Sequence, residues 1–546
     1  MSKSTETMEK IVALCRRRGF IFGSSEIYGG IGGFWDYGPL GVELKRNIKD
    51  CWWNDMIRNP PPGPNGRTFQ MVGVDCSIIM NPKVWEASGH VGGFADPMRK
   101  CDGCGHFVRE DQLWEILASD SKWLDSLLQV FTPVTGSIDS PRLLNWAKSK
   151  GRKLAPNLAL VRNPEVTLSW LASRVNGQPD APPTVQEICQ YVATEQLHQT
   201  GLQDPCPRCG NPLGPAAPFK LMFESHTGIE QNEGSKVYLR PETAQGIFVN
   251  FKNVMDSTRV KIPFGIGQIG KAFRNEITPR NYTFRSREFE QMEIEFFCNP
   301  KESMVWYEFW RDVRIKWYES LGIKSDKLRP REQGEDELAH YSDACTDIEY
   351  MFPFADEPQE LEGVAHRGNF DLSAHGKASK GKENAFAVMD DSEQNRDRKG
   401  AGSSPARFVP HVIEPSAGVD RFTLAAITEA YSFDENRASP EFMKFHPRLA
   451  PIKAAVFPLV AKDGMPEIAE PIYQEIRKQF TCRYDAKQSI GKRYARMDEA
   501  GTPFCFTIDS QTKEDGTVTV RNRDDASQDR IDKSRCLQYL RDKLGL

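Results

Sequence analysis

The 546-residue sequence contains no run of 18 or more apolar residues, which is about the length that a helix needs to cross a bilayer. Its first residues, Met1 to Ser4, also lack the apolar stretch of a secretory signal. These absences argue against a membrane-bound or secreted protein. We therefore expect a cytoplasmic protein with no membrane partner.

A strong net charge is also missing, because 71 Lys and Arg nearly balance 75 Asp and Glu and leave a formal charge of −4. The net charge therefore gives no indication of nucleic-acid binding. The charge is unevenly distributed, however. Residues 446–546 carry 18 Lys and Arg against 15 Asp and Glu, a mild local excess of positive charge.

A disulfide framework is absent from the pattern of the 13 cysteines, since many of them stand alone in the sequence. Only Cys101-x-x-Cys104 and Cys206-x-x-Cys209 are organised, and both pairs have the spacing that holds tetrahedral Zn²⁺. Four thiolates leave no open coordination position, so we predict a structural zinc site. The separation of the pairs is unusual, which keeps unpaired thiols as the alternative.

The chain shows no internal repeats or heptads, and its length predicts two to four folding units. We predict a catalytic domain from residues 1–100 and 210–445, with a helix from Val42 to Ile57 and another from Glu302 to Leu321. Residues 101–209 read as a mostly helical insertion domain, with its own positions at Trp114, Leu117, Trp123, Leu127 and Trp170. A polar segment from Lys377 to Ser404 reads as a surface insertion.

Residues 446–546 read as a separate α/β domain with partly parallel strands. Strand-like runs at Ile452 to Val460, Thr502 to Ile508 and Thr517 to Arg521 alternate with helical patterns at Ile468 to Phe480 and Ala526 to Lys543.

A strand, loop and strand pattern carries the first chemical motif. Gly270 to Glu276 and Glu288 to Phe297 read as strands, and Ile277 to Arg287 as the loop. Period-two alternation places Arg274 and Glu276 on one face, and likewise Gln291, Glu293 and Glu295. Loop arginines at 280, 285 and 287 suit phosphate oxygens. The alternative is an exposed hairpin whose charged side chains are solvated and bind no ligand.

A strand that runs directly into a helix carries the second motif, from Val409 to about Tyr431. Its alternation places Glu414, Ser416 and Gly418 on one strand face. Arg421 then falls in the first helical turn, where free amide groups also favour an anion.

These two segments resemble motifs 2 and 3 of class II aminoacyl-tRNA synthetases. The form Glu-Pro-Ser-Ala-Gly-Val-Asp-Arg at 414–421 is that of the dimeric glycyl-tRNA synthetases, in which Ser416 and Asp420 replace a more general glycine and glutamate. Strings at 35–41, 87–90, 94–97 and 239–246 agree with that family. The helix from Val42 then resembles motif 1, which implies a homodimer.

The resemblance implies an antiparallel α+β catalytic domain and a C-terminal anticodon-binding domain that bind glycine, ATP with Mg²⁺ and tRNA(Gly). Arg274 and Arg421 would be the catalytic arginines, and Glu360 would be the first choice for Mg²⁺. The expected ATP-binding residues are Arg274, Asn275, Glu276, Phe284, Arg285, Ser286, Arg287, Glu288, Phe289, Glu360, Leu361, Gly418, Val419, Asp420 and Arg421.

Glycine has no side chain to hold, so its selection must come from exclusion. Carboxylates at Glu242, Glu293 and Glu414 with Ser416 would bind the ammonium and fill the space of a methyl group, while Arg109 and Arg367 would face the carboxylate. The expected glycine-binding residues are Arg109, Glu242, Phe289, Glu290, Gln291, Met292, Glu293, Arg367, Glu414, Pro415, Ser416, Ala417 and Gly418.

Isolated histidines such as His90 and His366 are more often packed than catalytic, and we assign none of them to proton transfer. Two other functions remain open: a synthetase-like accessory protein without catalysis, and a ligase that makes an acyl-adenylate without tRNA. The presence of all the motif residues argues against the first, and the C-terminal domain argues against the second.

Overall fold

The computed structural model describes residues 3–93, 95–113, 116, 140–154, 159–162, 164–165, 168, 206–209, 213–334, 337–339, 342–389, 407–437 and 439–545. The chain forms two compact units, one of residues 1–91 and 222–546 and the other of residues 92–221. The second unit contains the predicted insertion, 101–209, and extends beyond it at both ends. Across the described ranges, no helix combines the length and the apolar character needed to span a membrane.

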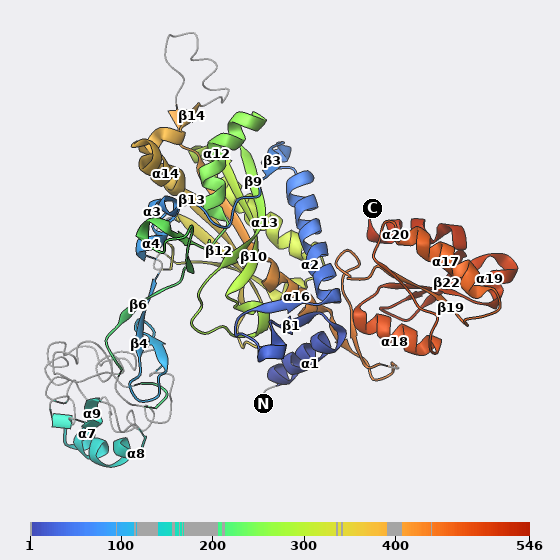
Figure 1. Cartoon of the computed structure of the whole chain (residues 1–546), viewed down its shortest axis with the longest axis horizontal. Coiled ribbons are helices and arrows are strands. Elements are labelled where there is room, and N and C mark those ends of the chain that lie inside the picture. The colour runs from blue at the N-terminus through green and yellow to red at the C-terminus, as the bar shows by residue number, and fades with distance from the viewer. Residues whose placement is uncertain are drawn as a thin grey trace, which may run out of the picture. The chain divides into compact units, whose positions relative to one another are not determined.

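A seven-stranded sheet, which crosses the middle of Figure 1, organises the large unit. Its neighbouring strands are antiparallel except for the edge pair β3 and β9. The predicted antiparallel α+β architecture is thus confirmed. In spatial order the strands are β11 (Leu328–Glu332), β12 (Ala344–Tyr350), β13 (Gln359–Gly368), β16 (His411–Gly418), β10 (Glu288–Cys298), β9 (Phe264–Phe273) and β3 (Gln70–Gly73).

One face of this sheet is apolar and covered by helices. Met292, Ile294 and Phe296 of β10 point into a core that also contains the tryptophans of α13 (Ser303–Ser320) and the apolar face of α2 (Pro39–Trp52). Each such side chain contributes about 1.5–3 kcal/mol by leaving water. Both predicted helices are confirmed, and a π-helical turn, Trp53–Arg58, extends α2.

A smaller core covers one end of the sheet, where α12 (Ala244–Thr258) packs near α14 (Phe370–Lys380). At the start of the predicted surface insertion, residues 377–380 are exposed and form the last turn of α14. The preceding part of the helix packs through Leu372 and His375, which are buried. The rest of the predicted insertion from residue 390 to Ser404 lies outside the described residues.

The first motif strand ends earlier than predicted. β9 stops at Phe273, so Arg274 and Glu276 follow the strand and do not share one of its faces. Arg274 N makes a last ladder bond to Arg287 O at 2.9 Å, and Glu276 N then turns back to Arg274 O at 2.7 Å. The second motif is confirmed, since β16 runs directly into α16 (Val419–Ala430).

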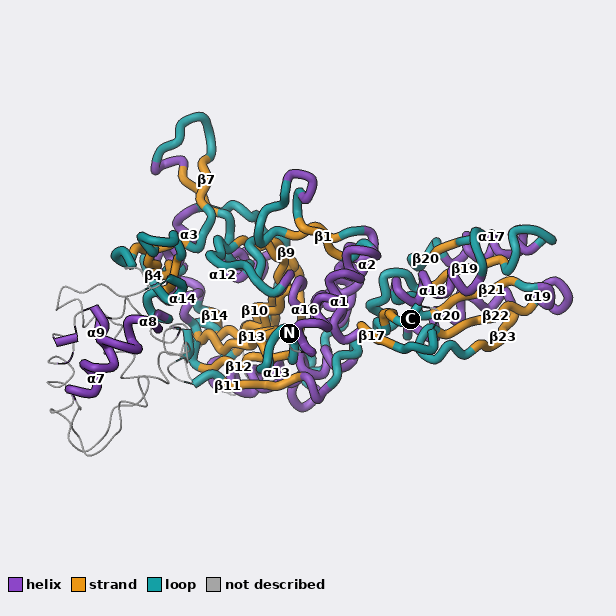
Figure 2. Tube along the Cα trace, turned by 90° about the horizontal axis from the view of Figure 1, so that it is seen from below, coloured by secondary structure: helices purple, strands orange, loops and turns teal. Residues whose placement is uncertain are grey.

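The C-terminal region forms a five-stranded sheet in the order β20, β19, β21, β22, β23, visible in Figure 2. β19 is parallel to both neighbours and the remaining pairs are antiparallel, which confirms partly parallel strands. The predicted helix from Ala526 was wrong at its start, because residues 528–532 pair with β22 as an edge strand. The elements are β19 (Ala454–Pro458), α17 (Met465–Ile476), β20 (Cys482–Tyr484), α18 (Ile490–Ala500), β21 (Phe504–Ile508), α19 (Ser510–Asp515), β22 (Thr517–Asn522), β23 (Gln528–Asp532) and α20 (Cys536–Leu544).

The second unit contains a three-stranded sheet, in the order β5, β4, β6, and short helices. Trp114, Leu117, Trp123, Leu127 and Trp170, on which the helical prediction relied, lie outside the described residues. Its elements are β4 (Ala95–Lys100), β5 (Phe107–Arg109), α7 (Ser140–Trp146), α8 (Arg152–Leu154), α9 (Ala159–Arg162) and β6 (Ala217–Lys220). Within the described ranges, the remaining α-helices and strands are α1 (Lys3–Arg18), β1 (Ile21–Gly23), β2 (Trp35–Tyr37), α3 (Pro82–Ala87), α4 (His90–Gly93), β7 (Glu224–His226), β8 (Lys236–Tyr238), β14 (Val388–Met389), β15 (Arg407–Phe408), β17 (Tyr431–Phe433) and β18 (Glu441–Met443).

Candidate active site

A cavity of about 390 Å³ lies on the polar face of the central sheet. It is lined by the loop between β9 and β10 and by strands β10, β12, β13 and β16. Strand alternation explains this placement, because the side chains opposite the apolar core face the cavity. The predicted site residues that line it are Glu242, Arg274, Glu276, Phe284, Arg285, Ser286, Phe289, Gln291, Glu293, Glu360, Glu414, Ser416, Gly418, Asp420 and Arg421.

Hydroxyl groups fix the carboxylate of Glu293 at the floor of the cavity. Glu293 pairs across the sheet with Ser416, whose Oγ donates to Glu293 Oε1 at 2.7 Å. Thr243 Oγ1 donates to the other oxygen, and the backbone N–H of Thr243 donates to Gln291 Oε1 at 3.2 Å. The carboxylate therefore has a single defined orientation.

Two further carboxyl groups stand beside Glu293. One carboxylate oxygen of each of Glu293, Glu295 and Glu414 lies within 4.8 Å of the other two. Burial raises the pKa of Glu295 well above its usual range, and the charge of Glu414 raises it further. Burial also raises the pKa of Glu414 to about 8, with Arg367 opposing and Glu293 and Glu242 adding to the rise. The cluster thus retains protons near neutral pH.

Arg367 holds Glu414 from behind and does not line the cavity. Its Nη1 donates to Glu414 Oε2 at 2.8 Å, while Nε and Nη2 donate to Asp371 at 2.8 and 3.0 Å. This fork is 2% exposed. The structure thus places Arg367 against two carboxylates, whereas we expected it to face the carboxylate of the substrate.

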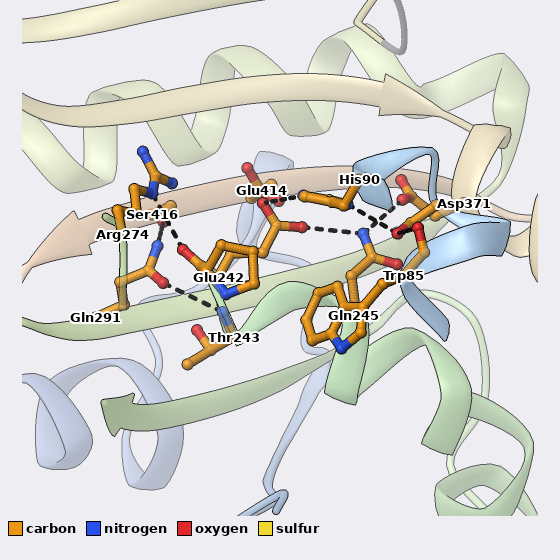
Figure 3. Close-up of polar contacts among 12 residues, drawn as sticks. Trp85, His90, Glu242, Thr243, Gln245, Arg274, Gln291, Asp371, Glu414 and Ser416 are labelled. Carbon is orange, nitrogen blue, oxygen red and sulfur yellow. Dashed lines mark hydrogen bonds and ion pairs between the residues drawn. The ribbon is translucent and has the colours of Figure 1, made fainter. Parts of the chain in front are cut away.

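Glu242 receives a partner that the sequence did not reveal, as Figure 3 shows. His90 Nε2 lies 3.5 Å from Glu242 Oε2, and Gln245 Nε2 donates to Glu242 Oε1 at 3.0 Å. Burial raises the pKa of Glu242, but His90, Arg367 and Gln245 lower it more, so that it falls well below its usual range. His90 is itself packed against Trp85, and nothing in the local sequence indicated that His90 would contact Glu242.

The other end of the cavity carries arginines and aromatic rings. The guanidinium of Arg421 lies 4.7 Å from the ring centroid of Phe284, and its Nη1 is 3.0 Å from Glu360 Oε1. The Arg421 charge lowers the pKa of Glu360. Arg274 Nε donates to Pro241 O at 3.1 Å, and its guanidinium lies over Phe289. Rings beside fixed guanidinium groups suit a nucleotide with a polyphosphate.

Several predicted residues are not brought to the cavity. Glu290 lies on the other face of β10, where its carboxylate pairs with Lys45 and Lys49. Asp420 does line the cavity, but its carboxylate turns away from it, with Oδ1 2.7 Å from Lys45 Nζ and 2.5 Å from Tyr37 Oη. It thereby ties α16 to α2. The others that do not line the cavity are Asn275, Arg287, Glu288, Met292, Leu361, Arg367, Pro415, Ala417 and Val419.

Arg109 belongs to the second unit, where its guanidinium donates to Asp111 and lies 3.2 Å from Asp96. Its expected role in binding glycine stays a prediction.

Strand β12 and the segment before it supply cavity residues that the sequence reasoning missed. Cys345 and Asp347 alternate along β12, so the period-two pattern of Ala344 to Tyr350 could have placed them on one face. The missed lining residues are Thr283, Gln333, Glu337, Ala339, Ser342, Cys345, Asp347, Gly363 and Ala365.

The two cysteine pairs converge within the second unit. Cys101 Sγ lies 3.5 Å from Cys209 Sγ, and Cys104 Sγ lies 3.8 Å from Cys206 Sγ. These separations exceed a disulfide bond of about 2.05 Å. They match the distance of about 3.8 Å between ligands of a tetrahedral zinc with Zn–S bonds of about 2.3 Å. The backbone N–H of Cys104 points at Cys101 Sγ at 3.4 Å, as expected for a thiolate knuckle.

Comparisons with known proteins agree with this arrangement. Residues 453–543 match the family model described as anticodon binding domain. The glycine–tRNA ligase of Rhodopirellula baltica is 47% identical, with 96% of this chain and 97% of the relative covered. The glycine–tRNA ligase of Ruminiclostridium cellulolyticum is 43% identical, with 98% of each covered. Among solved structures, a prolyl-tRNA synthetase of Cryptosporidium parvum has the same fold at 11% identity, with a TM-score of 0.56, covering 100% of this chain and 79% of that one.

Proposed function

The chain belongs to the glycine–tRNA ligases, which are class II aminoacyl-tRNA synthetases, and from this membership we propose how its residues carry out the reaction. The enzyme activates glycine with ATP and transfers the glycyl group to tRNA(Gly). The carboxylate oxygen of glycine attacks the α-phosphorus of ATP, and the bond from that phosphorus to the diphosphate breaks. The protein has to align these groups and offset their charge.

The cluster of buried carboxylates is the observation that supports the assignment of the glycine subsite. Glu242, Glu293, Glu414 and Ser416 all line the cavity, and carboxylate oxygens of Glu293 and Glu414 lie within 4.8 Å of each other. An ammonium group would satisfy these oxygens, and the packed carboxylates would leave no room for a substrate methyl group. A larger amino acid would then either clash or leave a buried charge unpaired.

The arginine end of the cavity would take ATP. Arg274 would hold the α-phosphate and Arg421 the distal phosphates, with Phe289 beneath the adenine. Arg421 pairs with Glu360, so phosphate binding would exchange one anionic partner for another. Glu360 would then be available as an oxygen ligand for the Mg²⁺ that accompanies ATP.

Structural zinc fits the four cysteines of the second unit, since their sulfur separations suit a tetrahedral ion. The thiolates of Cys101, Cys104, Cys206 and Cys209 would hold the metal, which would stabilise that unit without joining the chemistry.

We also propose the division of labour along the chain. Residues 1–100 and 210–445 would form the catalytic domain, 101–209 the insertion, and 446–546 the domain that binds the anticodon. The mild positive charge of the last segment suits contact with phosphates. We further propose a homodimer in the cytoplasm, in which the α2 helix would contribute to the subunit interface.

Glycine-dependent exchange of labelled diphosphate into ATP, without tRNA, tests the activation step. We expect exchange with glycine and none with alanine, and removal of one guanidinium in Arg274→Ala to lower the rate about 10²- to 10³-fold. Arg530→Ala, which removes an arginine of the C-terminal sheet, should leave exchange unchanged. Equal rates for Arg274→Ala and the unaltered chain would contradict the assignment.

A further inference from the structure

Two histidines and one aspartate converge behind the catalytic sheet, outside the cavity. His366 of β13, His411 of β16 and Asp343 before β12 each offer one ligand atom, and these atoms lie within 4.8 Å of one another. Asp343 Oδ2 lies 3.2 Å from His366 Nδ1. The three residues come from separate segments of the chain, so the fold itself assembles the cluster.

We propose that Asp343, His366 and His411 form a binding site for a divalent transition-metal ion, independent of the four cysteines. Two imidazoles and one carboxylate suit Zn²⁺, Ni²⁺ or Cu²⁺. Two ligands on a tetrahedral ion with bonds of about 2.0–2.1 Å lie about 3.3 Å apart, close to the observed separation of Asp343 Oδ2 and His366 Nδ1.

His366 Nδ1 has two polar neighbours in the protein. Nδ1 of His366 faces both the carboxylate of Asp343 and the backbone N–H of Gly368, which lies at 3.3 Å. A neutral ring nitrogen cannot donate to the first and accept from the second at once. The nitrogen has one in-plane lone pair, and a metal ion would bind it at the place where a ring proton otherwise faces Asp343 Oδ2.

Packing holds the two imidazoles beside each other. His366 is buried, and its ring lies edge-on to that of His411 with a centroid separation of 5.3 Å. The site remains reachable, since the Asp343 side chain is 65% exposed. Gly368 adopts a φ of +56°, and a Cβ there would lie 3.0 Å from Asp343 Oδ2, so the glycine preserves the approach of this carboxylate.

The position gives such an ion a route to influence the active site. His366 and Arg367 are neighbours on β13 but point to opposite faces of the sheet, and Arg367 holds Glu414. A β-bulge between His366 and Gly368 sets this geometry. Asp343 likewise follows Ser342, which lines the cavity.

Ni²⁺ titration of the purified full-length chain by calorimetry tests the proposal. Asp343→Asn and His411→Gln each remove one ligand, and His226→Gln removes an exposed histidine of β7 as the matched control. All variants keep the four cysteines, so differences among them report the new site alone. Melting curves without added metal verify that each variant is folded, and the exposed position of Asp343 makes that substitution mild.

We expect one nickel ion per chain at this site, with affinity at least about tenfold weaker in Asp343→Asn and in His411→Gln and unchanged in His226→Gln. Equal binding by all four proteins would overturn the proposal. A loss of nickel affinity in only one of the two ligand variants would also overturn it, because Asp343 and His411 would then not bind the same ion. Nickel uptake that is absent from the unaltered chain would overturn it as well.

Discussion

Glycine binding should release a proton from the carboxylate cluster at neutral pH. In the resting site Glu414 lies among Glu242, Glu293 and Glu295, and Arg367 is the cation that contacts it. Burial and the neighbouring carboxylates raise the pKa of Glu414 to about 8. The positive ammonium of glycine would favour the ionised carboxylate, and the proton would leave as glycine enters.

The size of this effect follows from linkage. A carboxyl group with a pKa near 8 is about 90% protonated at pH 7, so a pKa below about 5 in the complex means release of roughly 0.9 protons per glycine. The direction of the pH dependence of glycine affinity follows, because glycine binds the ionised form of Glu414 and a higher pH increases the fraction of that form. Affinity should therefore rise with pH, by roughly 50-fold between pH 6 and pH 8.

Calorimetric titration with glycine in two buffers of different ionisation enthalpy measures the protons exchanged. Glu414→Gln removes the titrating group and should abolish the release along with much of the affinity. Glu337→Gln, which replaces a more exposed glutamate of the same cavity, should keep the release. Proton uptake, or an affinity that is flat between pH 6 and pH 8, would refute the reasoning.

Three other outcomes are expected. Glu293→Gln should raise KM for glycine about tenfold to 100-fold, while KM for ATP changes little. Steady-state exchange kinetics measure both constants, and equal changes in the two would contradict the role of Glu293 in selecting glycine. Arg314→Met leaves Glu362 buried without its bidentate partner and should lower the free energy of unfolding by about 3–5 kcal/mol. Arg311→Met, which breaks an exposed pair, should lower it by less than about 1 kcal/mol. Urea denaturation measures both values, and similar values for the two variants would contradict the account. The purified chain should hold at least one zinc per chain by elemental analysis. Cys104→Ser should hold less, so an undiminished zinc content in that variant would contradict the cysteine site.

Much of the fold was predictable because its signals are local. The alternation of Met292, Ile294 and Phe296 with polar neighbours identified β10 and its two faces. The passage from strand to helix at Gly418 and Val419 was equally clear. The edge strand at residues 528–532 was not, because its side chains are largely exposed and its pairing with β22 is a tertiary contact.

The site was predictable where strand periodicity or motif spacing carried it. Glu293, Glu414 and Ser416 meet because neighbouring strands place them in register. Listing continuous stretches such as 288–293 included Glu290 and Met292, although alternation alone turns both away from the cavity. The partnership of His90 with Glu242 is a long-range contact, which no local pattern encodes. The fork of Arg367 on Asp371 spans only four residues, but it joins the end of β13 to the start of α14, so neither strand nor helix periodicity indicates it.

A crystal structure with a non-hydrolysable glycyl-adenylate analogue tests the central claim most directly, namely that the carboxylate cluster selects glycine by holding its ammonium. The account predicts the ammonium nitrogen within about 2.7–3.2 Å of carboxylate oxygens of Glu242, Glu293 and Glu414, with the phosphate beside Arg274. An ammonium that contacts none of these carboxylates would contradict it.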